Sequence, residues 1–97
     1  MGVYSMTQVV KRSGRREFYN EDKVRKSLES AIRNAGYNVN DKSQFVDKTV
    51  RNVSRNVKIM SEVPSEQIKN IVERNIAQEE RTSGDAGIST AWKNYER

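Results

Sequence analysis

A group of charged and polar residues near the N-terminus has the types and the spacing of an anion-binding site. Lys11 and Arg12 precede a Ser-Gly pair typical of a tight turn, and Glu17 follows on the returning segment. Asn20 and Lys23 stand where a helix is expected to begin. The free N–H groups and dipole of a helix N-terminus favour phosphate, and neighbouring cations add charge and hydrogen bonds. Together these residues predict a phosphate site, although single basic residues on a hairpin are usually only solvated.

The sequence lacks the residues of most catalytic and metal sites. It contains no cysteine and no histidine, which excludes disulfides, Cys/His zinc sites and histidine proton shuttles. It has no glycine-rich phosphate loop of the Walker type, and no paired carboxylates in a recognisable catalytic motif. A carboxylate-bound Mg²⁺ would need a substrate phosphate to complete its ligands. We therefore expect no enzyme activity, no catalytic residue and no metal site built by the protein alone.

Length and charge are those of one small basic domain. The 97 residues carry a net charge of +5, and the pI is about 9.7. A basic balance favours anionic partners and also fits a solvated basic surface. No signal peptide or long apolar run is visible, so we expect a cytoplasmic protein without a membrane partner. Residues 1–7 show no pattern and are expected to form a disordered leader to a domain over residues 8–97.

The elements that must position the anion site follow from turn residues and apolar spacing. Two β-favouring runs flank Ser13 and Gly14, which predicts a β-hairpin within residues 9–19 and a positive φ at Gly14. Asn20 is a good N-cap for a first helix, which Gly36 ends. Its apolar face, at helical spacing, comprises Val24, Leu28, Ala31, Ile32 and Ala35.

A second helix and a short strand are expected in the middle of the chain. Asn40 or Asp41 could cap this helix. Its apolar positions are Phe45, Val46, Thr49, Val50, Val53 and Val57. Residues 57–60 fit the tail of the helix, and a short strand near residues 57–63 fits equally well because β-branched valines gather there.

Two more helices complete the chain. Pro64 stops the preceding element, and Ser65 is expected to cap the third helix. A loop over residues 82–84 then leads to a fourth helix capped by Asp85. The inward positions of these two helices are Ile68, Ile71, Val72, Ile76, Ile88, Ala91, Trp92 and Tyr95.

The stretch from Val9 to Val24 resembles the opening of the ATP-cone domain. This domain is the allosteric nucleotide-binding module at the N-terminus of many ribonucleotide reductases, and it also occurs in the nucleotide-sensing repressor of their genes. The family pattern is roughly V-x-K-R-D-G-R-x-E-x-F-D-x-x-K-I, and this chain has VVKRSGRREFYNEDKV without a gap. The substitutions are mild: Ser13 for Asp, Tyr19 for Phe, Asn20 for Asp and Val24 for Ile.

The resemblance extends over about residues 8–97. Family members enter their third helix through a Val-x-Ser/Thr-Glu-Glu-Ile sequence, and residues 63–73 here are VPSEQIKNIVE. The family's last helix has an Ala-Tyr-x-x-Tyr-Arg character. Residues 91–97 here are AWKNYER, in which Lys93 and Asn94 replace residues that are usually apolar in the family.

The resemblance implies a mainly α member of the α+β class. The expected architecture is a four-helix bundle capped by a small three-stranded mixed sheet, made by the hairpin and the strand near residues 57–63. The module binds ATP or deoxy-ATP, with or without Mg²⁺, between sheet and helices, and it has no catalysis of its own. The implied partners are an adenine nucleotide and a regulated protein such as a ribonucleotide reductase, or a second copy of the chain. A chain without cysteine cannot build the zinc ribbon of the repressor.

The resemblance also implies roles for individual residues. Lys11, Arg12 and Lys23 would bind the phosphates, while Glu17 and Asn20 would hydrogen-bond the base or sugar side. The remaining positions implied in the pocket are Val9, Val24, Ser65, Lys69 and, by a looser alignment, Arg97. Of these, Val24 would pack on the base.

Several of these residues have simpler interpretations. Ser65 is also a plain helix cap, and Lys69 fits a solvated helix face equally well. Tyr19 and Trp92 could stack on a base, but their positions fit core residues better.

Two other functions are consistent with parts of the sequence. A small basic nucleic-acid-binding protein is supported by the net charge and by four cations within residues 11–16. Elsewhere, however, basic residues alternate with acidic ones along the helices, as on solvated faces. The other alternative is a helical protein–protein adaptor without a ligand.

Overall fold

The predicted hairpin joins a strand from the middle of the chain in one sheet. The computed structural model describes residues 6–95, with Tyr95 described in its backbone alone. β1 (Gln8–Val10) is the central strand, antiparallel to β2 (Arg16–Phe18) and parallel to β3 (Glu62–Pro64). This is the expected three-stranded mixed sheet.

The turn of the hairpin is longer than the tight turn predicted around Ser13 and Gly14. The N–H of Lys11 donates to the carbonyl of Arg15 at 2.8 Å, and the N–H of Gly14 donates to the carbonyl of Lys11 at 2.8 Å. Gly14 has a φ of 88°, which confirms the predicted positive value. A turn followed by one left-handed residue is the usual geometry of a three-residue hairpin loop.

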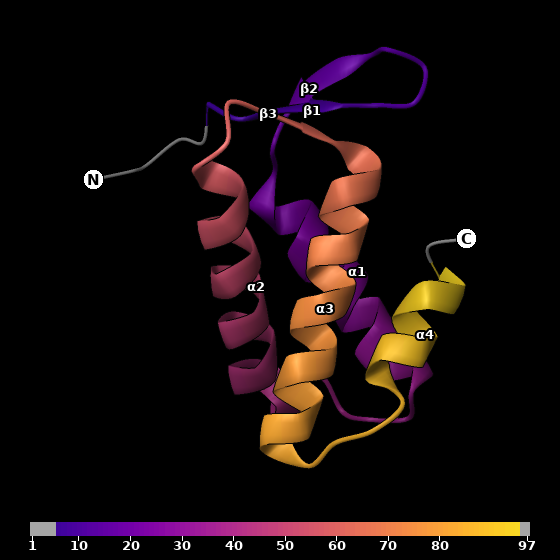
Figure 1. Cartoon of the computed structure of the whole chain (residues 1–97). Helices are drawn as coiled ribbons and strands as arrows, with labels where there is room; N and C mark the ends of the chain where they lie inside the picture. The colour runs from indigo at the N-terminus through magenta and orange to yellow at the C-terminus, as the bar shows by residue number, and fades with distance from the viewer. Residues whose placement is uncertain (1–5, 96–97) are drawn as a thin grey trace.

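The helices lie below the sheet in the view of Figure 1. They are α1 (Glu21–Asn34), α2 (Ser43–Lys58), α3 (Ser65–Ser83) and α4 (Ile88–Tyr95), with a 3₁₀ turn, η1 (Asn40–Lys42), before α2. α1 packs against α2 and α4, and α3 packs against the same two helices. The bundle capped by a sheet is therefore the predicted α+β, mainly α, architecture.

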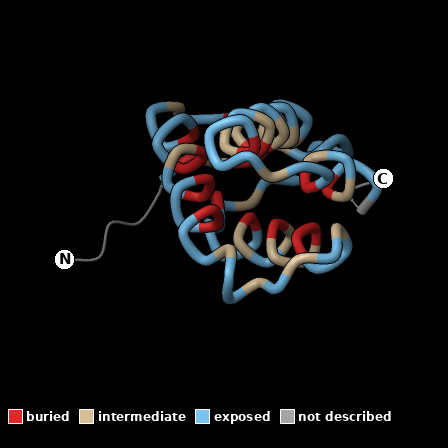
Figure 2. The backbone as a smooth tube through the Cα atoms, turned by 90° about the horizontal axis from the view of Figure 1, so that it is seen from below, coloured by how far each residue is buried: buried red, intermediate tan, exposed pale blue. Residues whose placement is uncertain are grey.

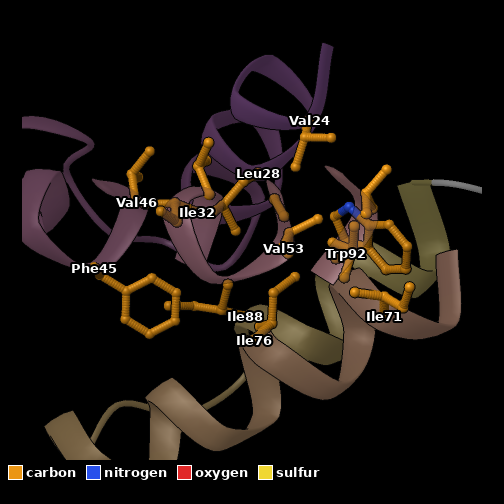
Figure 3. Packing of buried hydrophobic residues seen from close by; sticks show 14 of the residues in the cluster. Val24, Leu28, Ile32, Phe45, Val46, Val53, Ile71, Ile76, Ile88 and Trp92 are labelled. Carbon is orange, nitrogen blue, oxygen red and sulfur yellow. The ribbon is translucent and has the colours of Figure 1, made fainter. Parts of the chain in front are cut away.

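The apolar faces predicted from helical spacing meet in one core. In Figure 2 the buried positions line the inner sides of the helices. Figure 3 shows labelled residues of all four helices, from Val24 of α1 to Trp92 of α4, in one cluster. The buried hydrophobic residues are Val9, Tyr19, Val24, Leu28, Ala31, Ile32, Phe45, Val46, Val50, Val53, Val57, Val63, Ile71, Val72, Ile76, Ile88 and Trp92. The core placement of Tyr19 and Trp92 is thereby confirmed, while the side chain of Tyr95 and all of Arg97 lie outside the described residues.

The strand expected near residues 57–63 forms over Glu62–Pro64, because α2 continues to Lys58 before the chain turns. Pro64 is part of this strand and does not merely end it. β3 is an edge strand, so the missing N–H of Pro64 removes no bond from the interior of the sheet. Ser65 is consequently the first residue of α3, and the N-cap is Pro64, without a side-chain cap hydrogen bond. The predicted capping role of Ser65 is wrong.

The predicted cap of α2 is also wrong. Asn40 and Asp41 lie within η1, and α2 begins at Ser43 without a side-chain cap hydrogen bond. The side chain of Asn38 instead accepts a hydrogen bond from the N–H of Asn40 at 2.8 Å. The capping interaction therefore lies at the start of the 3₁₀ turn.

α3 is longer than predicted, and Asp85 does not cap α4. Residues 82 and 83 are helical, and α3 ends at Gly84, which has a φ of 79°. The carboxylate of Asp85 accepts hydrogen bonds from Lys42 Nζ at 2.6 Å and from Ser83 Oγ at 2.8 Å. The Asp85 carboxylate is thus bound to Lys42 and Ser83, and the first amides of α4 donate to a different residue.

Glu80 of α3 caps α4 across the loop. Its carboxylate accepts hydrogen bonds from the N–H of Ile88 at 2.9 Å and of Ser89 at 3.2 Å. Glu80 is buried, and these amides are two of the N–H groups that a helix start leaves without an intrahelical partner. The cap therefore comes from a residue that the sequence pattern places on another helix.

Thr7, the last residue of the expected leader, lies inside the fold. Its side chain is buried, and its hydroxyl donates to the carbonyl of Met60 at 2.6 Å. Its own carbonyl accepts from the N–H of Tyr19 at 2.9 Å. Thr7 thus belongs to the folded domain, whereas residues 1–5 lie outside the described part of the chain. No helix in residues 6–95 is both long enough and apolar enough to cross a membrane.

Candidate functional site

A pocket of about 390 Å³ lies where the sheet meets α1, α3 and α4. This volume is within the range of small-molecule sites, roughly 300–1,000 Å³. Eight of the ten residues predicted for the site line it. The lining comprises Val9, Lys11, Glu17, Phe18, Tyr19, Asn20, Lys23, Val24, Lys26, Ser27, Ser65, Ile68, Lys69, Val72 and Trp92.

Lys11, Glu17 and Lys23 meet at the edge of this pocket. Lys11 Nζ and Lys23 Nζ each lie 3.3 Å from the same oxygen, Oε1 of Glu17. Strand pairing explains the arrangement, because Glu17 lies opposite Val9 in the antiparallel ladder and Lys11 follows Val9 by two residues. The ammonium groups of Lys23 and then Lys11 hold the pKa of the Glu17 carboxyl below its ordinary value. The juxtaposition brings two cations to one point of the pocket.

The helix N-terminus available to an anion is that of α3 rather than that of α1. The side chain of Asn20 caps α1 and accepts a hydrogen bond from the N–H of Asp22 at 2.9 Å. α3 has no side-chain cap, and its first residue, Ser65, lines the pocket. Lys69, one turn further along α3, adds a cation on the same side. The positive end of the α3 dipole therefore borders the site.

The inner wall of the pocket is largely apolar and includes Val24, Val72 and Trp92. The indole Nε1 of Trp92 donates to Ser27 Oγ at 3.4 Å, and this hydroxyl donates to the carbonyl of Val24 at 2.8 Å. Tyr19 also contributes to the wall, but its hydroxyl is hydrogen-bonded to Ser54 Oγ at 2.8 Å. Burial raises the pKa of the Tyr19 phenol. A flat apolar group of a ligand could therefore pack against this wall.

Arg12 does not join Lys11 in this pocket. Its guanidinium pairs with Glu66 at 2.9 Å, and its side chain is 86% exposed. Arg12 instead lines a neighbouring hollow of about 360 Å³ with Val10 and residues 62–66, and Lys11 and Ser65 line both this hollow and the pocket. Arg12 lies in the turn of the hairpin, beyond the end of β1, where its guanidinium reaches Glu66 of α3.

The sequence prediction missed several lining residues, of which Lys26 and Phe18 are the most informative. Lys26 follows Lys23 at the i+3 spacing that places two residues on one helix face, and this spacing could have identified it. Phe18 is 59% exposed, one of the few large apolar side chains in residues 6–95 with that exposure. Nothing in the hairpin pattern distinguishes Phe18 from its neighbours.

The described residues contain no group of three acidic side chains that could hold a metal ion. The pocket thus combines four lysines, one carboxylate, an uncapped helix N-terminus and an apolar wall. A phosphate group fits the lysines and the helix N-terminus, because it pairs with ammonium groups and accepts hydrogen bonds from free amides. A base would pack on the apolar wall. A nucleotide is a ligand that combines both chemistries.

Comparison with known proteins agrees with this chemistry. No curated protein and no solved structure is similar enough to the chain to count as a match. A family model does match: the ATP cone domain, over residues 7–90. ATP cones are nucleotide-binding regulatory modules and are not catalytic by themselves. Because the match covers nearly the whole chain, this protein belongs to the ATP cone domain family.

Proposed function

We propose that this domain binds ATP or deoxy-ATP in the pocket as a regulatory ligand. The observation that carries the proposal is the meeting of Lys11 from the hairpin and Lys23 from α1 at one point. With Lys26 and Lys69, the lining as far as the structure describes it holds four lysines against one carboxylate, that of Glu17. This excess of positive charge suits a triphosphate.

The proposed roles follow the position of each residue. Lys11 and Lys23 bind the phosphates, supported by Ser65 and Lys69 at the start of α3. Val9 lines the site, and Val24 packs on the base. The side chain of Glu17 receives hydrogen bonds from the base or sugar, as does that of Asn20 where its capping bond leaves an oxygen lone pair.

Arg12, Arg97 and Mg²⁺ have a different standing in the proposal. Arg12 can join the phosphates only if its guanidinium leaves Glu66. Arg97 lies outside the described residues, so its predicted role remains a prediction from the resemblance. Mg²⁺, where it accompanies the nucleotide, would be held mainly by phosphate oxygens and water.

Regulation requires that the nucleotide bind more tightly to one state of the protein than to another. In the proposed mechanism these states differ in association with a catalytic or regulatory partner protein, or with a second copy of the chain. We propose that the domain acts in the cytoplasm and contributes no catalytic step of its own.

Calorimetric titration with ATP, deoxy-ATP and GTP tests the proposal. We expect Lys11→Ala and Lys23→Ala each to weaken adenine-nucleotide binding by about 1.5–3 kcal/mol, the scale of a charge-assisted hydrogen bond. Lys48→Ala is the matched control, because Lys48 is exposed on α2, does not line the pocket and has no ion pair within residues 6–95. Unchanged affinity in both pocket variants would show that the phosphates bind elsewhere.

Nucleic-acid binding is a second candidate function, favoured by the outer face of α2. Lys48, Arg51 and Arg55 are exposed at helical spacing, and none of them has an ion pair among the described residues. A duplex bound through this face would be released steeply by salt, whether or not ATP is present. Lys48→Ala would then weaken duplex binding and leave ATP binding unchanged, so the same control variant separates the two functions.

A further inference from the structure

The Glu17 carboxylate lies between two lysine ammonium groups, where an anionic ligand of the pocket would be expected to bind. Its Oε1 lies 3.3 Å from the ammonium groups of both Lys11 and Lys23, and it is the single carboxylate in the lining of the pocket as the structure describes it. Only a third of its side chain is exposed. The pairing places it there, because β2 carries Glu17 opposite Val9 on the pocket side.

Any phosphate that uses these two lysines must share them with this carboxylate or displace it. Both anions would accept hydrogen bonds from the same ammonium groups, and two anions at one point repel each other. The low pKa of the Glu17 carboxyl keeps it charged at neutral pH, so the competition persists under ordinary conditions. Glu17 therefore opposes phosphate binding unless the ligand compensates for the loss.

We infer that Glu17 is a specificity-determining residue, which makes the pocket select a nucleoside triphosphate over free polyphosphate. A nucleoside offers hydrogen-bond donors, the amino group of its base and the hydroxyls of its sugar, which a displaced carboxylate can accept. An inorganic polyphosphate at neutral pH essentially only accepts hydrogen bonds, so it has no donor group for the Glu17 carboxylate. Specificity of this kind comes from a repulsive element built against the wrong ligand. The inference rests on the nucleotide function proposed above.

The contacts of Glu17 are poorly explained by stability alone. Both ion pairs involve partly exposed side chains, with 44% exposure for Lys11 and 65% for Lys23. Pairs at such exposure contribute little to the free energy of folding. Replacement of Glu17 by an uncharged residue should therefore leave the fold intact and alter the balance between ligands.

The test is calorimetric titration of the wild-type chain and Glu17→Gln with ATP and with inorganic tripolyphosphate. Glu79→Gln is the matched control, because it makes the same change of charge on α3 away from the pocket lining. We expect tripolyphosphate to bind about fivefold more tightly to Glu17→Gln than to the wild type or to Glu79→Gln, the size of effect that a partly exposed ion pair can have. The preference for ATP over tripolyphosphate should fall by at least the same factor.

Equal tripolyphosphate affinity in the wild type and Glu17→Gln would overturn the inference about Glu17. ATP binding by the wild type would in that case still support the nucleotide site. If the wild type binds no ATP, the proposed function fails, and the inference fails with it as a statement about nucleotides. Thermal unfolding of each variant checks the fold. Should Glu17→Gln fail to fold, Glu17→Ala, which also removes the carboxylate, takes its place with the same expected outcome.

Discussion

Thr49 places a hydroxyl group without a hydrogen-bond partner in the described part of the core. Its side chain is fully buried on α2, and its Oγ1 has no hydrogen-bond partner in the part of the chain that the structure describes. A buried hydroxyl that loses its water hydrogen bonds without replacement lowers stability by roughly 1–3 kcal/mol. The position is apolar in the helical pattern, and valine has nearly the same shape as threonine.

We therefore expect Thr49→Val to raise the free energy of unfolding by about 1 kcal/mol. Urea denaturation measures it as a higher midpoint at constant slope. Thr49→Ala is the control, since it removes the hydroxyl but also a methyl group and should be destabilising. A lower midpoint for Thr49→Val than for the wild type would mean that the hydroxyl is satisfied in solution.

At the scale of elements, α4 is held by a cap from another helix. Glu80 of α3 accepts hydrogen bonds from two amides at the start of α4, and α4 carries Trp92 into the pocket wall. An eight-residue helix is too short to be stable without such contacts. The position of α4, and with it one wall of the pocket, thus depends on Glu80.

Glu80→Ala should lower the free energy of unfolding by about 1–2 kcal/mol, as the loss of a helix cap does. It should also shift the fluorescence of Trp92, the single tryptophan of the chain, toward that of an exposed indole. Glu79→Ala, one residue away on α3 and not involved in the cap, serves as the comparison. Identical stability and fluorescence in the two variants would argue against the capping role.

The loop before α4 makes stability depend on pH. Hydrogen bonds from Lys42 and then Ser83 hold the pKa of the Asp85 carboxyl below its ordinary value of 3.8. Because the folded-state pKa is the lower one, this contribution is fully present above about pH 4 and is lost as the pH falls through the folded-state pKa. The Lys42–Asp85 pair is largely buried, with 21% and 13% of the side chains exposed, so it should matter more than a surface pair.

Asp85→Asn should therefore be less stable than the wild type at pH 7, by about 1 kcal/mol. The difference should shrink as the pH falls below 3.8 and through the folded-state pKa, because the wild-type carboxylate then becomes protonated as well. Urea denaturation at pH 7 and at a series of pH values below 3.8 measures both quantities. A difference that stays constant with pH would assign the effect of the substitution to packing instead of charge.

At the scale of the whole molecule, the pocket joins elements that are distant in sequence. Its lining comes from β1, β2, α1, α3 and α4, so a bound ligand would contact five of the eight elements at once. A ligand that binds only the folded state stabilises it by an amount set by its concentration relative to Kd. Ligand binding should therefore raise the free energy of unfolding of the complete domain.

ATP at a hundredfold excess over Kd should raise the free energy of unfolding by about 2.7 kcal/mol. Differential scanning calorimetry would detect this as a higher Tm, and Lys23→Ala should show a smaller rise at the same ATP concentration. GTP and Lys48→Ala provide the ligand and protein controls. Equal ATP-induced rises in Tm for the wild type and for Lys23→Ala would point to nonspecific stabilisation by anions.

The helices, the hairpin and most of the candidate site could be predicted from local sequence patterns. Apolar residues at helical spacing give a helix its buried face wherever it packs, so α1 to α4 could be recognised without knowing their neighbours. The left-handed φ of Gly14 and the capping role of Asn20 are equally local, because each depends on a residue's own backbone and its next few amides. Lys11, Glu17 and Lys23 were found for the same reason: all lie within one short segment.

Contacts between segments that are distant in sequence could not be predicted in this way. The helix starts at Ser65 and Ile88 were mispredicted because β1 pairs with Pro64 and because Glu80 reaches across a loop. Arg12 lies outside the pocket because Glu66 of α3 comes within reach of its guanidinium in the turn of the hairpin. Trp92 became part of the pocket wall because α4 packs back on α1. Local propensity has no term for such contacts, since they exist only after the chain has folded.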